Sequence, residues 1–169
     1  MPAVETIGFP AECSLYARLG EATFHDAFEA DLAGASLTPL EIAIRFLRAT
    51  PAWTEALLAI RNRAVSLVGI RDVGALGAVS DKPAGDYKVG DKLSFFDIFA
   101  INETELLLGA DDSHLDVRIA FVKRRASGRA TYALCSWVKT HNALGRLYMI
   151  PVGPMHKLIV RSAMQDLVV

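Results

Sequence analysis

The densest group of polar side chains in the sequence lies between residues 111 and 118. At the two-residue period of a strand, His114, Asp116 and Arg118 would share one face, with next-but-one side chains ~7 Å apart. Asp116 could then pair with Arg118 or orient His114, and a carboxylate that holds an imidazole suits general-base catalysis. The alternative is a row of exposed mixed charges, which adds little stability. Because the intervening positions are apolar, the sequence leaves open which face of the sheet these residues occupy.

A second group of polar residues lies where the last expected strand gives way to the last expected helix. Asn142 suits the N-cap of that helix, and His141 could face either a cavity mouth or solvent. Arg146 could bind an anion or lie on the surface, whereas Tyr148 falls on the apolar side of the helix. This junction is therefore a second place where a ligand could bind.

Two more residues complete the candidate ligand site. Asp26 falls on the apolar side of an alternating segment, which is unusual for a carboxylate, and Trp137 is expected in the core or in a cavity wall. The expected ligand-binding residues are Asp26, His114, Asp116, Arg118, Trp137, His141, Arg146 and Tyr148, and the catalytic candidates are His114, Asp116, Arg118 and His141.

The sequence lacks the residue patterns that metal binding, dinucleotide binding or a reactive cysteine would require. His114 and Asp116 could form half of a metal site, but no further ligand spacing supports it, so we expect no metal. The Gly74–Gly77 segment lacks the strand–turn–helix context of a dinucleotide-binding loop, so we expect no cofactor. Cys13 and Cys135 are far apart in the sequence, have no activating neighbour and are expected to be reduced.

The composition bounds the class of protein. With 169 residues, the chain has the size of one domain, 1–169, in which 1–20 form an N-terminal lead-in. Hydrophobic residues make up 52% and charged residues 22%, which excludes disorder. The net charge of −1 gives no basic excess, so we expect no nucleic-acid partner. Neither a signal peptide nor an apolar run of ~20 residues occurs, so we expect no membrane association and a cytoplasmic location.

Helix signals occur in three places. The Thr38–Glu41 segment contains a capping box with proline at the first helical position. A second helix follows Pro51, and we expect its apolar stripe to be buried; the stripe includes Trp53, Leu57, Ile60 and Ala64. One apolar stripe also continues from Leu144 to Ser162 across two prolines, which predicts a single long helix that begins near Asn142 and is kinked around 151–154.

Strand signals surround these helices. Alternation or β-rich composition predicts strands at 22–31, 93–101, 104–109, 114–124 and 130–141, and the last two form a hairpin that turns at 126–128. The glycine-rich residues 71–92 predict a long loop or lid. The order predicts an α+β helix-grip fold, in which a curved antiparallel sheet of at least five strands wraps a long C-terminal helix. Such a sheet has one face for the helix and one for water or partners.

Three segments also resemble the DUF2867 family, which is bacterial and of unknown function. They are Leu107–Arg118, Thr140–Tyr148 and Pro154–Val160, and the resemblance covers nearly the whole chain. Val117 stands where the family pattern has an aromatic residue and Met155 where it has Phe, and both exchanges stay apolar. The resemblance implies a fold similar to Bet v 1/START-like helix-grip domains. Some longer relatives carry a preceding NAD(P)-binding domain that this sequence lacks, so no nicotinamide activity is implied.

These observations lead to three functional hypotheses. The first is a module that binds a small apolar or amphipathic ligand in a cavity between the sheet and the C-terminal helix. The second is a cofactor-independent acid/base enzyme that acts on such a ligand through the histidines and charges named above. The third is an interaction subunit of an oxidoreductase, suggested by the fused relatives. A homodimer is compatible with each of them.

Overall fold

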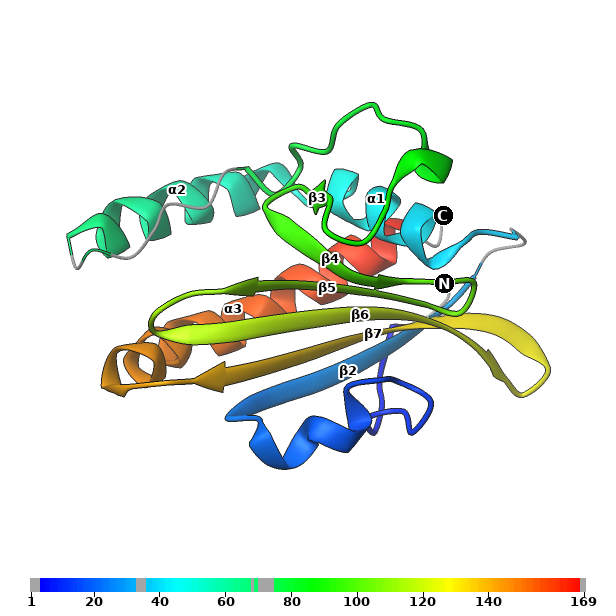
Figure 1. Cartoon of the computed structure of the whole chain (residues 1–169), viewed down its shortest axis with the longest axis horizontal. Helices are drawn as coiled ribbons and strands as arrows, with labels where there is room; N and C mark the ends of the chain where they lie inside the picture. The colour runs from blue at the N-terminus through cyan, green and yellow to red at the C-terminus, as the bar shows by residue number, and fades with distance from the viewer. Residues whose placement is uncertain (1–3, 33–35, 68, 70–74, 168–169) are drawn as a thin grey trace.

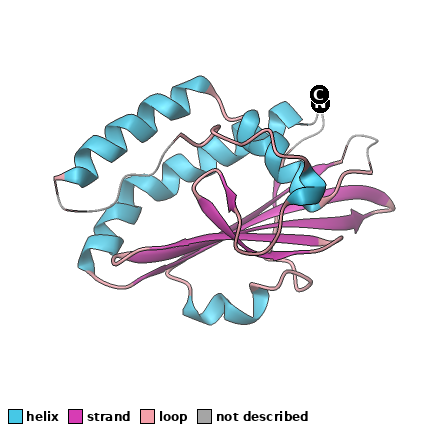
Figure 2. Cartoon of the chain, turned by 45° about the horizontal axis from the view of Figure 1, so that its top comes forward, coloured by secondary structure: helices cyan, strands magenta, loops and turns pink. Residues whose placement is uncertain are grey.

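An antiparallel sheet carries the three α-helices on one face and the N-terminal segment on the other (Figures 1 and 2). The computed structural model describes residues 4–32, 36–67, 69 and 75–167. The strands are β1 (Glu5–Thr6), β2 (Phe24–Asp31), β3 (Lys92–Leu93), β4 (Phe96–Ile101), β5 (Glu105–Asp111), β6 (Leu115–Ala126) and β7 (Arg129–Thr140). The helices are α1 (Pro39–Arg48), α2 (Ala52–Ser66) and α3 (Ala143–Leu167), with short 3-10 helices η1 (Tyr16–Glu21) and η2 (Ala84–Asp86).

The seven strands follow the order β1-β2-β7-β6-β5-β4-β3, and every neighbouring pair is antiparallel. The β6–β7 hairpin lies in the middle of this order, and each of its strands has twelve residues. Its turn places Ser127 at φ 51° and Gly128 at φ 79°, the two left-handed residues that a two-residue hairpin turn requires. The predicted α+β class, the antiparallel sheet and the C-terminal helix are confirmed.

The expected single strand 93–101 is wrong, because a tight turn divides it. Ser94 adopts φ 58°, and the chain reverses so that β3 pairs with β4 through Leu93 and Phe96. The turn leaves Phe95 outside both strands. Of the expected loop 71–92, residues 71–74 lie outside the described residues, and the remainder contains η2.

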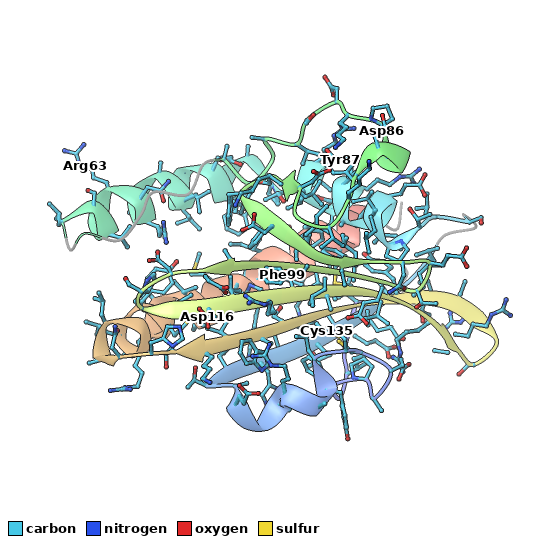
Figure 3. All side chains as sticks on the ribbon, in the orientation of Figure 1. Arg63, Asp86, Tyr87, Phe99, Asp116 and Cys135 are labelled. Carbon is cyan, nitrogen blue, oxygen red and sulfur yellow. The ribbon has the colours of Figure 1, made fainter. Side chains whose placement is uncertain are left out.

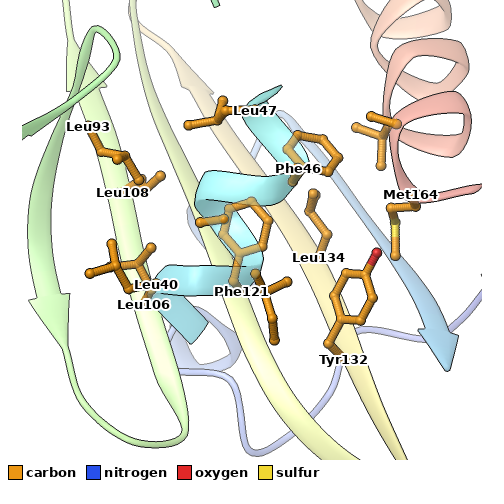
Figure 4. Packing of buried hydrophobic residues seen from close by; sticks show 14 of the residues in the cluster. Leu40, Phe46, Leu47, Leu93, Leu106, Leu108, Phe121, Tyr132, Leu134 and Met164 are labelled. Atoms are coloured by element: carbon orange, nitrogen blue, oxygen red, sulfur yellow. The ribbon is translucent and has the colours of Figure 1, made fainter. Parts of the chain in front are cut away.

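Helix α1 begins at the predicted capping box. The backbone N–H of Glu41 donates to Thr38 Oγ1 at 3.2 Å, and the backbone N–H of Thr38 donates to Glu41 Oε2 at 2.7 Å. The buried side of the helix packs over the sheet beside α3 (Figure 4). There Phe46 contacts Phe121 of β6 edge to face, with ring centroids 5.4 Å apart.

Helix α2 does not bury the predicted stripe. Trp53 is 40% exposed and Ile60 66% exposed, whereas Thr54 and Val65 are buried. Apolar residues occur on several sides of this helix, so their spacing alone does not select the inward face. Arg63 points away from the rest of the chain (Figure 3).

Helix α3 runs unbroken from Ala143 to Leu167 with Pro151 and Pro154 inside it. The side chain of Asn142 caps its first turn, because Oδ1 accepts from the backbone N–H of Gly145 at 3.0 Å. Gly145 is buried against the carbonyl group of His114, and a Cβ at this position would overlap that oxygen. The start of α3 is therefore held directly against the start of β6.

Two groups of buried side chains occupy the two faces of the sheet. The main core lies between the sheet, α1 and α3, and Figure 4 shows ten of its members by label. The second group lies on the opposite face, where Cys13 and Leu15 of the N-terminal segment pack against Cys135 and Trp137 of β7. The face expected to meet water or partners is thus partly covered by residues of the same chain.

We expect Gly145→Ala to destabilise the fold by about 1–3 kcal/mol, because backbone cannot yield to the added methyl group as a side chain can. Gly153→Ala in the same helix is the matched control. Its Cβ would lie 3.4 Å from the ring of Phe24, and the gain in helix propensity offsets that contact, so stability should change by less than about 1 kcal/mol. Chemical denaturation measures both, and equal stabilities would contradict the close approach.

Candidate ligand cavity

A cavity lies between the sheet, α2 and α3. It has a larger compartment of about 490 Å³ and an adjoining one of about 200 Å³. The two compartments share one wall, which consists of Leu58, Arg61, Phe95, Phe96, Ile119, Tyr148, Val152 and His156. The larger compartment extends between α1, α2 and α3, and the smaller one extends toward the start of β6.

His114 is the buried histidine of the smaller compartment, with 2% of its surface exposed. Its ring meets that of Tyr148 edge to face, with centroids 5.3 Å apart. Neither ring nitrogen has a hydrogen-bond partner, and the nearest carboxylate oxygen, Asp112 Oδ2, lies 3.6 Å from Nδ1. Burial lowers the pKa of His114 from its ordinary value of 6.5, and the charge of Asp112 partly opposes this effect.

Arg61 joins the two helices that flank the cavity. Its Nε donates to the hydroxyl oxygen of Tyr148 at 3.0 Å, and its guanidinium lies 5.3 Å from the centre of the Tyr148 ring. Nη1 also donates to Asn62 Oδ1 at 2.8 Å. Because Arg61 belongs to α2 and Tyr148 to α3, these contacts tie α2 to the rest of the protein at the shared wall of the cavity.

A second polar cluster joins β2, β7 and α3. Asp26 pairs with Ser136 in the register of the sheet, and both face His156 of α3. Ser136 Oγ lies 2.8 Å and Asp26 Oδ1 3.4 Å from the same atom, His156 Nε2. Sequence reasoning selected Asp26 but missed Ser136 and His156. The signal was available, because a carboxylate on an apolar strand face needs a buried partner.

Asp116 and Arg118 share one face of β6, as expected, but the expectation that His114 shares it is wrong. β6 begins at Leu115, so the strand alternation does not extend to His114. Arg118 has the same parity as Ala120, which packs on the opposite face from the cavity, and it pairs there with Asp111 and stacks 4.0 Å from the Phe99 ring centre.

The remaining sequence candidates also lie away from the cavity. Asp116 contacts His141, with Oδ1 2.9 Å from Nε2, and both side chains are partly exposed. Trp137 is fully buried on the opposite face, where its Nε1 donates to the backbone oxygen of Arg18 at 2.9 Å. Arg146 is exposed. The structure thus places His114 and Tyr148 in the cavity wall and Asp26 directly behind it.

The two cysteines lie together on the face opposite the cavity, although their separation in the sequence gave no reason to expect a contact. Both are buried free thiols. A hydrogen bond with Cys135 lowers the pKa of Cys13, and the same contact together with burial raises the pKa of Cys135.

Among the described residues, no three or more His, Cys, Asp or Glu side chains gather where one metal ion could bind. No helix in the same part of the chain is long and apolar enough to cross a membrane.

A family model described as a protein of unknown function, DUF2867, matches residues 18–163. The chain belongs to the DUF2867 family. The matched range contains every described residue that lines the cavity of this DUF2867 protein, together with the whole sheet except β1. A comparison with curated proteins finds no match.

Acid should destabilise the protein through His114. Because burial lowers its pKa, the unfolded chain binds the proton more readily, so this contribution to stability is complete above about pH 6.5 and is lost as the pH falls below it. We expect His114→Phe, which keeps an aromatic ring, to lose less thermal stability than the wild type between about pH 7.5 and about pH 5.5. Parallel melting curves at both pH values check this, and identical losses would exclude a buried neutral imidazole.

Asp116→Ala should leave the protein almost unchanged. The Asp116–His141 pair is partly exposed and lies outside the cavity, so its removal should alter the free energy of unfolding by less than about 1 kcal/mol. Uptake of a hydrophobic dye should also equal that of the wild type. A clear loss in either measurement would return this strand segment to the candidate site.

Proposed function

We propose that this DUF2867 protein binds a small apolar or amphipathic molecule in the cavity, within an architecture similar to Bet v 1/START-like helix-grip domains with a kinked terminal helix. The observation that carries the proposal is a cavity of about 490 Å³ whose wall is almost entirely aliphatic and aromatic. Sites for small molecules commonly measure ~300–1,000 Å³ and combine apolar walls with a few placed polar groups.

The wall of the larger compartment explains why a ligand would be retained. It includes Leu57 and Val65 of α2, Leu108 and Leu134 of the sheet, and Ile159 of α3. Such side chains forgo packing contacts when the space between them is empty, and an apolar molecule restores those contacts while leaving water. The ligand would therefore complete the hydrophobic core between α2 and the sheet.

Polar groups gather toward the smaller compartment and would orient the ligand. Tyr148, Arg61 and His156 belong to the shared wall, and His114 and Ser136 lie beyond it. The Tyr148 hydroxyl accepts from Arg61, so its own O–H remains a donor. An amphipathic molecule would place its apolar part in the larger compartment and its polar group among these residues.

Filling the cavity should abolish binding. Val152 lines both compartments, so we expect Val152→Phe to weaken the binding of the neutral dye N-phenylnaphthylamine by more than about tenfold. Ile150→Phe is the control, because Ile150 lies on the same helix and is 69% exposed. Fluorescence titration measures both. Unchanged affinity in Val152→Phe, with the fold intact by circular dichroism, would place the dye elsewhere.

A second candidate function is acid/base catalysis on the bound molecule, favoured by the Asp26–Ser136–His156 cluster. The carboxylate of Asp26 and the hydroxyl of Ser136 both contact Nε2 of His156, which orients the imidazole, and His156 belongs to the wall of both compartments. The test is the exchange of protons next to the carbonyl of decan-2-one in heavy water, followed by NMR. Catalysis is supported if the wild-type protein speeds the exchange above its rate in buffer and His156→Phe does not. If the wild type leaves the rate in buffer unchanged, binding remains the function.

A further inference from the structure

We propose that the cavity selects a ligand with a neutral hydroxyl head group, which donates a hydrogen bond to Nε2 of His114 while the apolar part of the ligand fills the larger compartment. Because it names the ligand class of that cavity, this proposal rests on the proposed function.

His114 is an unsatisfied polar group in the wall of a binding cavity. It is 98% buried, it lines the smaller compartment, and neither of its ring nitrogens has a hydrogen-bond partner. Buried polar side chains in native proteins ordinarily have at least one partner, since burial removes the water that would otherwise supply it. Both nitrogens are shielded from the cavity as the ring lies, so a polar group of the ligand in the smaller compartment would meet this need after a rotation of the ring toward it.

The surroundings of the ring decide which kind of partner it needs. Asp112 Oδ2 lies 3.6 Å from Nδ1, so its charge favours the tautomer with the proton on Nδ1. Burial lowers the pKa of His114 and keeps the imidazole neutral at neutral pH. Nε2 then carries a lone pair and acts as an acceptor, so the ligand must supply the donor.

The charges of the wall favour a neutral donor over an ion. Among the lining residues, Arg61 and Asp112 carry opposite formal charges that cancel. The carboxylate of Asp26 lies just behind His156. An anionic head group would meet two carboxylates, and the one guanidinium already donates to Tyr148 and Asn62. A cationic head group would meet Arg61 instead. A hydroxyl group donates to His114 without bringing an unpaired charge into the cavity.

Three ligands of equal chain length test this choice. Decan-1-ol, its isomer methyl nonyl ether and decanoate are each titrated against N-phenylnaphthylamine bound to the wild-type protein. The alcohol and the ether differ in the donor proton, so we expect the alcohol to bind roughly five- to tenfold more tightly, as one buried hydrogen bond implies. Decanoate should bind more weakly than the alcohol.

The variant His114→Phe keeps the aromatic contact with Tyr148 and removes both nitrogens. We expect the tenfold-scale advantage of the alcohol to disappear, while the affinity for the ether stays within about twofold of the wild type. Asp112→Asn is the second variant. It removes the negative charge that favours the proton on Nδ1 of His114, so Nε2 is less often an acceptor and the advantage of the alcohol over the ether should fall. A uniform loss for alcohol and ether in His114→Phe would mean that the residue is structural, and that outcome overturns the proposal.

A measurement on the wild type avoids any effect of substitution on folding. The unprotonated ring nitrogen of ¹⁵N-labelled His114 should shift upfield when decan-1-ol binds and should not shift with the ether. Equal affinities for alcohol and ether, or tighter binding of decanoate, would also overturn the proposed head group while leaving cavity binding intact. Failure of all three ligands to displace the dye would instead reject the proposed function.

Discussion

The close approach of α3 to the start of β6 determines where every other part of the cavity can lie. Gly145 rests on the carbonyl group of His114, and that oxygen also accepts from the backbone N–H of His141 at 2.9 Å. The side chain of Asn142 contacts both segments. Its Nδ2 donates to the backbone oxygen of Ser113, just before β6, and its Oδ1 accepts from the backbone N–H of Gly145 in α3. The end of β7, the β5–β6 connection and the first turn of α3 are thus held together, which fixes the line along which α3 crosses the sheet.

Packing on the helix-bearing face is uneven along this line. Phe46 of α1 fills the space beside β6, whereas α2 remains at a distance and is tied to α3 through Arg61 and Tyr148. One end of the face therefore contains a dense core, and the other contains the cavity. Apolar side chains such as Leu57 and Leu58 of α2 are only half-buried as a result.

Local signals in the sequence were enough where a few neighbouring residues determine the structure. The capping box at Thr38 and the hairpin turn at Ser127 depend on hydrogen bonds and dihedral angles within four residues, and both were predicted. On α2 the predicted stripe faces the cavity through Leu57, Ile60 and Ala64, but its burial was wrongly predicted, because the depth of that face depends on a cavity formed by distant segments. Likewise, the face of His114 follows from where β6 begins, and the role of His156 follows from Asp26 and Ser136, which lie far away in the sequence.

If the cavity binds a ligand as proposed, that ligand becomes part of the hydrophobic core of the folded protein. The folded state alone offers this space, so by mass action an occupant at a hundredfold excess over its dissociation constant adds about 2.7 kcal/mol of stability. That is a substantial share of the ~5–15 kcal/mol that ordinarily separates folded from unfolded chains. Under this proposal, the supply of the ligand would govern how much of the protein escapes proteolysis, so the cellular abundance of the protein would follow the concentration of its ligand.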